Sequence, residues 1–391
     1  MKLALFFVSC MACLGLSGCG GSAASSGAVS MSAAAELGQE IFKDVSLSGS
    51  GRLSCASCHQ PELGHASPFD TPVALGGVNM DMPGSRLPPA IRYLRFNSAF
   101  ALAADGTPSG GFFWDGRANS LFEQARGPLL NVHEMANASV SAVVQKIAAA
   151  PYAAKFKQVF GADIFNNPDL AFDRVQHALA RYQQEDVEFA SFSSKFDAVN
   201  AGKASFNAQE LRGLAWFNRA DKGNCAACHP STQPSNAPAA LFTDFSYDSL
   251  GVPRNSAIAN NSDATFFDMG LCGPLRSDLS ARFDLCGAFK VPSLRNVALR
   301  KRFFHNGQFD SLRQAIQFYV TRDTQPQLWY PQDPQGHLVL YNDLPSLLRG
   351  NVNVTEAPYN RTRGQVAALS DAEIDDVLAF LATLTDGFFS P

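Results

Sequence analysis

The stretch "CASCHQPELG" (Cys55–Gly64) places two cysteines and a histidine at the spacing C-x-x-C-H. Three kinds of site use such an arrangement: a zinc half-site, a thiol–disulfide redox motif, and the attachment point of a c-type haem. In the last case both thiols bond covalently to the haem, and the adjacent histidine becomes the proximal iron ligand. The pentapeptide alone favours haem attachment.

A second copy of the motif, "CAACHP" (Cys225–Pro230), makes a chance match improbable. A zinc half-site would need two more ligands at comparable spacing, unless the two motifs met in space to share one ion. A redox pair would not need the histidine in both copies. We therefore predict two covalently bound c-type haems. Their anchors would be Cys55, Cys58, Cys225 and Cys228, and their iron ligands His59 and His229.

The segments that precede the two motifs also resemble each other. "ELGQEIFKDVSLSGSGRLSCASCH" and "ELRGLAWFNRADKGNCAACH" each place a glycine four residues before a phenylalanine, at Gly38 and Phe42 and again at Gly213 and Phe217. Each segment predicts a helix, a short loop and then the haem motif, which is how a cytochrome c domain begins. The sequence thus indicates an internal duplication.

The rest of the chain is mainly helical in pattern. Helices are expected in "SVSAVVQKIAAA" (139–150), in "DLAFDRVQHALARYQQEDVEF" (169–189) and near the C-terminus, where Ser370 and Glu373 form a capping box before an apolar 3.6-residue period. Strand signals are short and weak. The predicted fold class is mostly α, with two cytochrome c-like haem domains related by internal duplication.

Composition excludes some functions. The 391 residues are 46% hydrophobic with 31 phenylalanines, enough for a substantial core, and the net charge is only −4. No basic region indicates binding to nucleic acid, and there is no acidic tail.

The N-terminus reads as an export signal. A short apolar run follows Lys2 and ends in Leu16-Ser17-Gly18-Cys19, a sequence typical of a bacterial lipobox. Cleavage before Cys19 would leave that cysteine to carry lipid, and the alternative is ordinary signal cleavage a few residues later. We expect a periplasmic protein anchored to the outer membrane through Cys19. Because export permits disulfides, the two remaining cysteines, Cys272 and Cys286, are predicted to pair, the alternative being two buried thiols.

Two long blocks resemble the bacterial diheme cytochrome c peroxidase family. They are "GGFFWDGRANSLFEQARGPLLNVHEMAN" (110–137) and "FKVPSLRNVALRKRFFHNGQFDSLRQAIQFY" (289–319), in the family's order relative to the haem motifs. The resemblance extends from about residue 35 to residue 386. It implies that hydrogen peroxide reacts at one haem while the other relays or shares electrons. The family also contains the MauG-like branch, whose members oxidise residues of partner proteins.

The resemblance assigns roles in the first block. It implies that Gln124 and Glu134 lie on the distal side of the N-terminal haem and that Trp114 lies between the haems, where an indole can relay electrons. Cleaving a peroxide O–O bond requires a proton to move from one oxygen to the other, which a carboxylate in a partly apolar pocket can do. Without this block, Glu134 would more simply be interpreted as a solvated carboxylate on a loop. Trp114 would likewise be interpreted as an aromatic residue of the core.

The chain departs from the family at the first haem. Conventional members carry a histidine that caps the N-terminal iron, but the corresponding loop, "TPVALGGVNMDMPGSRLPPAIRYLRFN" (71–97), contains none. Met80 and Met82 are the only soft candidates, and we interpret them as loop residues. His65 follows His59 too closely to reach the opposite face easily. The first haem is therefore expected to be open to peroxide without prior reduction.

A second departure concerns the C-terminal haem, whose usual second ligand in the family is a methionine. Here that position reads Tyr319, on the inward face of a predicted helix, and a His/Tyr ligand pair resembles the MauG-like branch. Met269 is the rival ligand, and a plain core tyrosine is the other alternative. In the same block, Arg295 is a candidate partner of a haem propionate, and His305 is expected to be structural.

The calcium motif of many relatives is also altered, since Arg86 is followed by Leu87 and two prolines. Calcium is therefore not expected, although carbonyl groups near Arg300 and Arg302 could still contribute.

The predicted domains follow from these assignments. They are a lipoprotein signal peptide (1–18), a flexible tether (19–34), an N-terminal peroxidatic haem domain with linking helices (35–200) and a C-terminal electron-transfer haem domain (201–391). The predicted function is reduction of hydrogen peroxide, with high-valent oxidising equivalents shared with the second haem. Electrons would come from a small cytochrome c or cupredoxin. The alternatives are a MauG-like oxidase of Trp or Tyr in a partner protein and a diheme electron carrier. The sequence does not set the oligomeric state.

Overall fold

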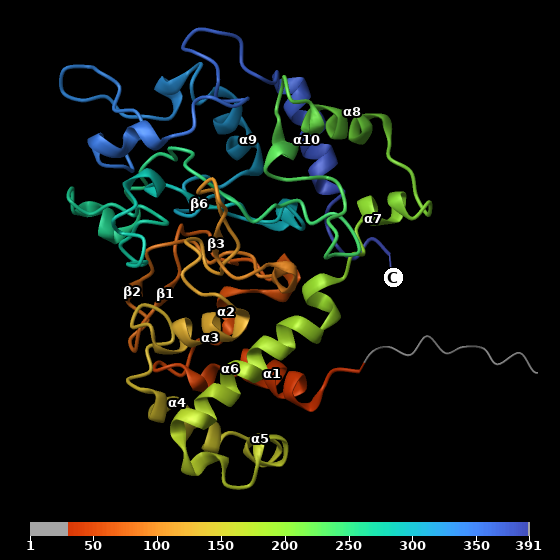
Figure 1. The fold of residues 1–391 in the computed structure, drawn as a ribbon, viewed down its shortest axis with the longest axis vertical. Helices are drawn as coiled ribbons and strands as arrows, with labels where there is room; N and C mark the ends of the chain where they lie inside the picture. Colours follow the sequence, from red (N-terminus) through yellow and green to blue (C-terminus); the bar gives the residue numbers. More distant parts are fainter. Residues whose placement is uncertain (1–29, 390–391) are drawn as a thin grey trace, which may run out of the picture. The chain divides into compact units, whose positions relative to one another are not determined.

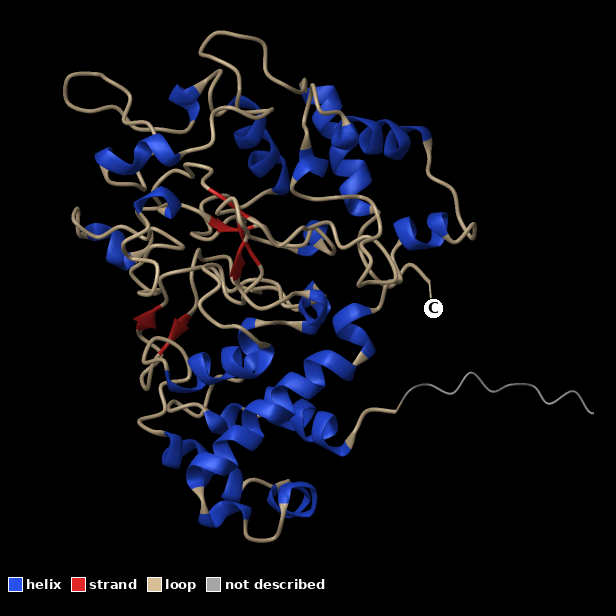
Figure 2. Ribbon diagram, in the orientation of Figure 1, coloured by secondary structure: helices blue, strands red, loops and turns tan. Residues whose placement is uncertain are grey.

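The structure is a computed structural model that describes residues 30–389. The predicted signal peptide, the lipobox and the tether up to residue 29 lie outside the described residues. By its internal contacts the chain divides into Met1–Ser30 and Met31–Pro391, and only the second unit is considered below. Helices dominate this unit, joined by long loops (Figure 2), which confirms the predicted fold class. None of the helices described has the length and apolarity needed to cross a membrane.

The α-helices are α1 (Ala33–Lys43), α2 (Cys55–Cys58), α3 (Leu121–Leu130), α4 (Val140–Ala149), α5 (Ala153–Phe160), α6 (Pro168–Glu185), α7 (Lys195–Asn200), α8 (Ala208–Asn218), α9 (Leu312–Thr321) and α10 (Asp371–Ala382). The strands form antiparallel pairs: β1 (Leu75–Gly76) with β2 (Met82–Pro83), β3 (Ala101–Leu102) with β4 (Pro108–Ser109), and β5 (Tyr247–Asp248) with β6 (Phe289–Lys290).

Two helix pairs explain the repeated glycine (Figure 1). Helix α1 packs against α6, and a Cβ atom on Gly38 would lie 2.0 Å from the carbonyl oxygen of Ala178. Helix α8 packs against α10 in the same way, with the same 2.0 Å approach between Gly213 and the carbonyl oxygen of Asp376. Any larger residue would force the backbones apart. The predicted helices around both glycines are confirmed, as is the predicted capping box that begins α10. Helix α8 begins with a second capping box, formed by Asn207 and Glu210.

Each helix pair has its own hydrophobic core. The first core contains Phe42 and draws on buried residues from Leu37 to Phe189. The second contains Phe217 and draws on buried residues from Phe196 to Leu384. Phe42 and Phe217, each one turn after its glycine, therefore occupy equivalent positions in the two cores. The exact domain boundary at residue 200 stays a prediction.

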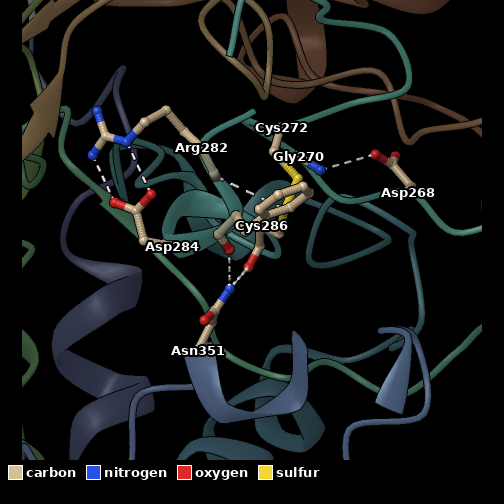
Figure 3. Close-up of a disulfide and its surroundings, with 8 residues drawn as sticks. Asp268, Gly270, Cys272, Arg282, Asp284, Cys286 and Asn351 are labelled. Carbon is tan, nitrogen blue, oxygen red and sulfur yellow. Dashed lines mark hydrogen bonds and ion pairs between the residues drawn. A yellow bond between two sulfur atoms is a disulfide. The ribbon is translucent and has the colours of Figure 1, made fainter. Parts of the chain in front are cut away.

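Cys272 and Cys286 form a disulfide, as predicted, with their Cα atoms 5.0 Å apart (Figure 3). The closed loop is tied to its surroundings. The side-chain amide of Asn351 donates to the carbonyl of Cys286 at 3.1 Å, and the backbone N–H of Gly270 donates to the carboxylate of Asp268 at 3.2 Å. Asp268 also forms an ion pair with Arg86 in the N-terminal half. The disulfide therefore supports a contact between distant parts of the chain.

Removing this disulfide with the double substitution Cys272→Ser and Cys286→Ser is expected to lower the free energy of unfolding by about 3 kcal/mol, the value for a loop of about 15 residues. The measurement is a urea titration of the wild-type and double-variant proteins, compared at equal haem content. An unchanged midpoint would mean that the tied loop holds its conformation without the covalent link.

Candidate functional site

The first C-x-x-C-H motif forms a single helical turn, α2, that begins at the N-cap Ser54. The backbone N–H of His59 donates to the carbonyl of Cys55 at 2.9 Å, which places the histidine directly after the turn. Both thiols are unpaired, and burial raises the pKa of Cys55 and Cys58 to about 12. Burial also lowers the pKa of His59 to about 4, so its imidazole is neutral, the form that binds a metal.

The second motif repeats this arrangement. A 3-10 turn covers Cys225–Ala227, and the backbone N–H of His229 donates to the carbonyl of Cys225 at 2.9 Å. The Nδ1 atom of His229 lies 2.9 Å from the carbonyl oxygen of Phe242, so it can donate there and leave Nε2 free to bind iron. Burial lowers the pKa of His229 and raises that of both thiols to about 12.

A large, mostly apolar cavity lies over the second motif. Cys225, Cys228 and His229 line it together with Tyr319 from α9 and aromatic residues such as Phe304. Unpaired thiols and a neutral histidine that face an apolar cavity fit a covalently bound haem. Among residues 30–389, no three or more His, Cys, Asp or Glu side chains gather as a metal cluster.

Basic side chains line the same cavity: Lys290, Arg300, Lys301 and Arg302. Burial alone lowers the pKa of Arg300 to about 10, and its buried Nε atom has no hydrogen-bond partner in the described part of the chain. Its guanidinium donates to the backbone carbonyls of Ser293 and Arg295, at 2.5 and 3.4 Å, and has no carboxylate partner among the described residues. It therefore suits a carboxylate ligand, such as a haem propionate. The run "RKR" at 300–302, unusual beside a buried segment, was the sequence signal that could have found it.

Arg295, the expected propionate partner, lies elsewhere. Its fully buried guanidinium forms two hydrogen bonds to the carboxylate of Asp197, at 2.8 and 2.9 Å, and a third to the carbonyl of Ala240 at 2.7 Å. With its donors used by the protein, Arg295 ties α7 to the loop after β6. The expectation of a propionate contact was therefore wrong, and Arg300 is the better candidate.

Tyr319 and Met269, the rival ligands of the second haem, occupy different places. Tyr319 lines the cavity with Cys228 and His229, and burial raises its pKa well above the ordinary range. Met269 does not line the cavity and instead shapes the disulfide loop, where its backbone N–H donates to the carbonyl of Gly273 at 2.8 Å. This geometry favours Tyr319.

Glu134 lies close to the first motif. Its negative charge raises the pKa of both Cys55 and Cys58, which places the carboxylate within electrostatic reach of the two anchors. Burial raises the pKa of Glu134 itself, although Asn131 donates a 2.8 Å hydrogen bond to its Oε1 atom and partly opposes the shift. A carboxyl group with a raised pKa near the haem anchor is suited to take and return a proton.

Gln124, Met80 and Met82 are the other residues considered for the first site from the sequence. Gln124 lies half-buried on α3, between the buried positions Leu121 and Ala125. The β1–β2 hairpin packs onto the backbone of Glu134, whose carbonyl accepts a 3.0 Å hydrogen bond from the N–H of Gly77. Met82 was expected to be a loop residue, but it begins strand β2 of this hairpin and is 37% exposed.

Trp114 lines the same cavity as Ala66 and Ser67, which follow the first motif, and therefore lies between the two halves. Its indole Nε1–H donates to the carbonyl of Leu87 at 2.8 Å, and the N–H of Leu87 donates to the carbonyl of His305 at 2.8 Å. Leu87 thus links the tryptophan indole to the backbone of His305, which lines the same cavity.

Sequence reasoning missed the charged residues that hold Trp114. The guanidinium of Arg86 bridges the carboxylates of Asp115 and Asp268, at 2.7 and 2.6 Å, and is almost fully buried. Arg117 also pairs with Asp115, at 2.9 Å. The partners are far apart in sequence, so no local pattern could reveal this cluster.

Comparison with known proteins agrees with this site. The di-haem cytochrome c peroxidase family profile matches residues 32–205. The methylamine utilization protein MauG of Paracoccus denitrificans is 35% identical, over 92% of this chain and 90% of MauG. Cytochrome c551 peroxidase of Nitrosomonas europaea is 32% identical, over 72% of this chain and 71% of that protein.

A solved structure extends the similarity to the fold. The diheme peroxidase BthA from Burkholderia thailandensis is 39% identical and superposes with a TM-score of 0.82, over 91% of this chain and 87% of BthA. The family implies two c-type haems, which agrees with the two free cysteines at C-x-x-C spacing in each motif. The resemblance seen in the two sequence blocks is thereby confirmed, and the chain belongs to the di-haem cytochrome c peroxidase family of oxidoreductases.

Proposed function

We propose that this protein reduces hydrogen peroxide at its first haem motif and shares the oxidising equivalents with its second. The observation that carries the proposal is the placement of Glu134: Asn131 holds its carboxylate at 2.8 Å, and the next residue, Met135, accepts a 2.5 Å hydrogen bond from the N–H of Gly49, in the segment that leads to the first motif. Burial also raises the pKa of this carboxyl group. When bound, each haem would supply a redox-active iron, held by His59 or His229. Two electrons and two protons convert hydrogen peroxide to two molecules of water.

Glu134 is proposed to take a proton from one peroxide oxygen and return it to the other. Asn131 donates to Oε1 of Glu134 at 2.8 Å, which orients the carboxyl group, and Gln124 could donate a hydrogen bond to the peroxide or to a water molecule. The β1–β2 hairpin fixes the backbone on the other side of the carboxylate. These residues separate the proposal from a diheme electron carrier, which needs no acid–base group at the first site.

Trp114 is proposed to carry oxidising equivalents between the two halves. The hydrogen bond to Leu87 holds the indole, and the Arg86–Asp115 ion pair fixes the residue that follows Trp114. At the second site, Tyr319 and His229 line one cavity and would together hold the iron of the second haem. An anionic phenolate favours the ferric and higher oxidation states, which suits a site that stores oxidising equivalents.

A second candidate function is oxidation of Trp or Tyr residues in a partner protein. Two observations favour it: MauG covers most of this chain at 35% identity, and Tyr319 lines the second cavity where a methionine would be expected. The two functions share the peroxide step and differ in the source of electrons, which is a small redox protein in one and the modified protein in the other.

The test mixes hydrogen peroxide with the purified, fully ferric protein and follows absorption and EPR spectra. We expect rapid loss of a high-spin ferric signal, because Met80 and Met82 belong to the β1–β2 hairpin region and the loop 71–97 contains no histidine that could cap the first iron. Reaction only after one-electron reduction would indicate a hidden sixth ligand. Absence of reaction in either state would leave the electron-carrier function.

We also propose that the reaction needs no calcium. Arg86 already places a positive charge between Asp115 and Asp268. The same experiment repeated after treatment with EGTA should give an unchanged rate, and a slower reaction that calcium restores would contradict the proposal.

A periplasmic location with a lipid anchor at Cys19 also remains our proposal. The disulfide between Cys272 and Cys286 supports it, because disulfides persist in oxidising compartments.

A further inference from the structure

Two tyrosines, Tyr359 and Tyr341, extend outward from the cavity over the second motif. Neither has a role in the proposed peroxide reaction. Tyr359 lines the cavity beside Tyr319, and the centroids of the two rings are 6.0 Å apart with an interplanar angle of 32°. Tyr359 is only 6% exposed, so this contact is dry on most sides. Rings this close can exchange electrons.

Arg322 continues the row away from the cavity. Its guanidinium carbon lies 4.4 Å from the centroid of the Tyr359 ring and 5.4 Å from that of Tyr341, so both rings pack on one group. The side chain is fully buried, forms an ion pair with Asp323 at 2.8 Å, and donates hydrogen bonds to the carbonyls of Leu250 and Asn353, at 2.8 and 2.6 Å. The geometry of the three side chains is therefore well defined.

Tyr341 ends the row and differs from the other tyrosines in its hydrogen bond. Its phenol donates to the carboxylate of Asp323 at 3.0 Å, and its side chain is partly exposed. A phenol can give up an electron at neutral pH only if its proton leaves as well, because its ordinary pKa is about 10. Asp323 is positioned to accept that proton.

We propose that Tyr359 and Tyr341 form an electron route between the second cavity and the protein surface, with Tyr341 as the residue that holds the oxidising equivalent. This inference rests on the proposed peroxide reaction, which supplies the oxidant. One electron leaves Tyr341 for the oxidised haem site, and the phenol proton moves to the carboxylate of Asp323. A neutral tyrosyl radical remains. An external one-electron donor, such as a reduced small cytochrome, returns the electron, and Asp323 returns the proton.

The surroundings of the two tyrosines explain why the oxidising equivalent would rest at Tyr341. The Arg322 guanidinium packs on both rings, so its positive charge disfavours a second positive charge on Tyr359. Tyr359 would therefore pass an electron on without retaining the oxidising equivalent. Tyr341 avoids the charge by losing its proton to Asp323.

The neighbouring Tyr330 provides a matched control. Its ring centroid is 5.5 Å from that of Tyr341, and the residue is 4% exposed. However, its phenol donates to the carbonyl of Gly251 at 2.6 Å, and a backbone carbonyl cannot accept a proton. Tyr330 is therefore close enough to the route to be oxidised but lacks the proton acceptor.

The experiment compares the haem-loaded wild-type protein with the variants Tyr341→Phe and Tyr330→Phe. Each protein is mixed in the ferric state with hydrogen peroxide, frozen after short intervals and studied by EPR, while absorption spectra follow the haems. Wild type and Tyr330→Phe should give a tyrosyl radical signal, identified by its narrowing in protein grown with ring-deuterated tyrosine. Tyr341→Phe should lose that signal with no change in the initial reaction of the haems with peroxide.

The outcomes separate the two proposals. Haem spectra that change without a tyrosyl signal, or a signal that Tyr341→Phe leaves intact, would overturn the electron route alone. Haem spectra that peroxide leaves unchanged would overturn the proposed function and, with it, the route. Slower reduction of peroxide-treated Tyr341→Phe by ferrous cytochrome c, relative to Tyr330→Phe, would further support the route.

Discussion

The substitution Glu134→Gln is expected to slow peroxide cleavage by about 10²- to 10⁴-fold, the range for loss of a positioned acid–base group. Glutamine keeps the size of the side chain and can still pair with Asn131, so the haem content and the fold should be preserved. What it loses is the ability to take a proton from one peroxide oxygen and give it to the other. The measurement is stopped-flow absorption after mixing the ferric protein with hydrogen peroxide.

Glu123→Gln is the matched control. Glu123 lies on α3, one residue before Gln124, is exposed, and accepts a 2.8 Å hydrogen bond from the backbone N–H of Asn119. It therefore has the same chemistry in the same region without access to the first site. Its peroxide kinetics should match those of the wild type. If Glu134→Gln also reacted at the wild-type rate, Glu134 would have no part in the mechanism.

The pH profile gives a second readout of the same prediction. Burial raises the pKa of Glu134 above its ordinary value, so its proton-accepting form is lost at a higher pH than for an exposed glutamate. The wild-type rate should therefore fall on acidification with a midpoint above the ordinary glutamate pKa of about 4.3. That acidic limb should be missing in Glu134→Gln, because an amide does not titrate in this range.

Much of this architecture could be predicted from local sequence patterns. The glycine–phenylalanine repeat located equivalent helices because Gly38 and Gly213 each allow a close backbone contact with a second helix. The haem motifs and the Cys272–Cys286 pair were also accessible, since their chemistry depends on residue type and spacing. Likewise, helical periodicity placed Tyr319 on the inward face of α9, where it lines the cavity.

The contacts that failed prediction are those between distant charged residues. Arg295 was expected to face a haem propionate, but it is held by Asp197, almost a hundred positions away. The Arg86–Asp268 pair joins segments still further apart. A buried charge takes whichever partner the tertiary structure brings within reach, and this choice is not encoded in spacing or periodicity.

The substitution Tyr319→Phe is expected to raise the reduction potential of the second haem by on the order of 100 mV, within the range of about 0.8 V that axial ligands span. Phenylalanine preserves the packing against Phe304, whose ring centroid is 5.4 Å away. However, it lacks the phenol oxygen, which is the only atom of the Tyr319 side chain that could bind iron. Loss of an anionic ligand destabilises the ferric state, so the potential should rise. Potentiometric titration measures the shift, and the low-spin EPR signal of the second haem should change with it.

Met269→Leu distinguishes this interpretation from its rival. Met269 belongs to the disulfide loop and does not line the cavity, so its substitution should leave both the potential and the EPR signal unchanged. In the opposite result, Tyr319→Phe would leave the potential and the EPR signal unchanged and Met269→Leu would change them. That result would require the disulfide loop to rearrange when haem binds. Because Tyr319 lies far in sequence from the first motif and lines a cavity over the second, Tyr319→Phe should still react with peroxide at its first site. Persistent peroxide reactivity with a shifted second potential would therefore assign separate roles to the two halves.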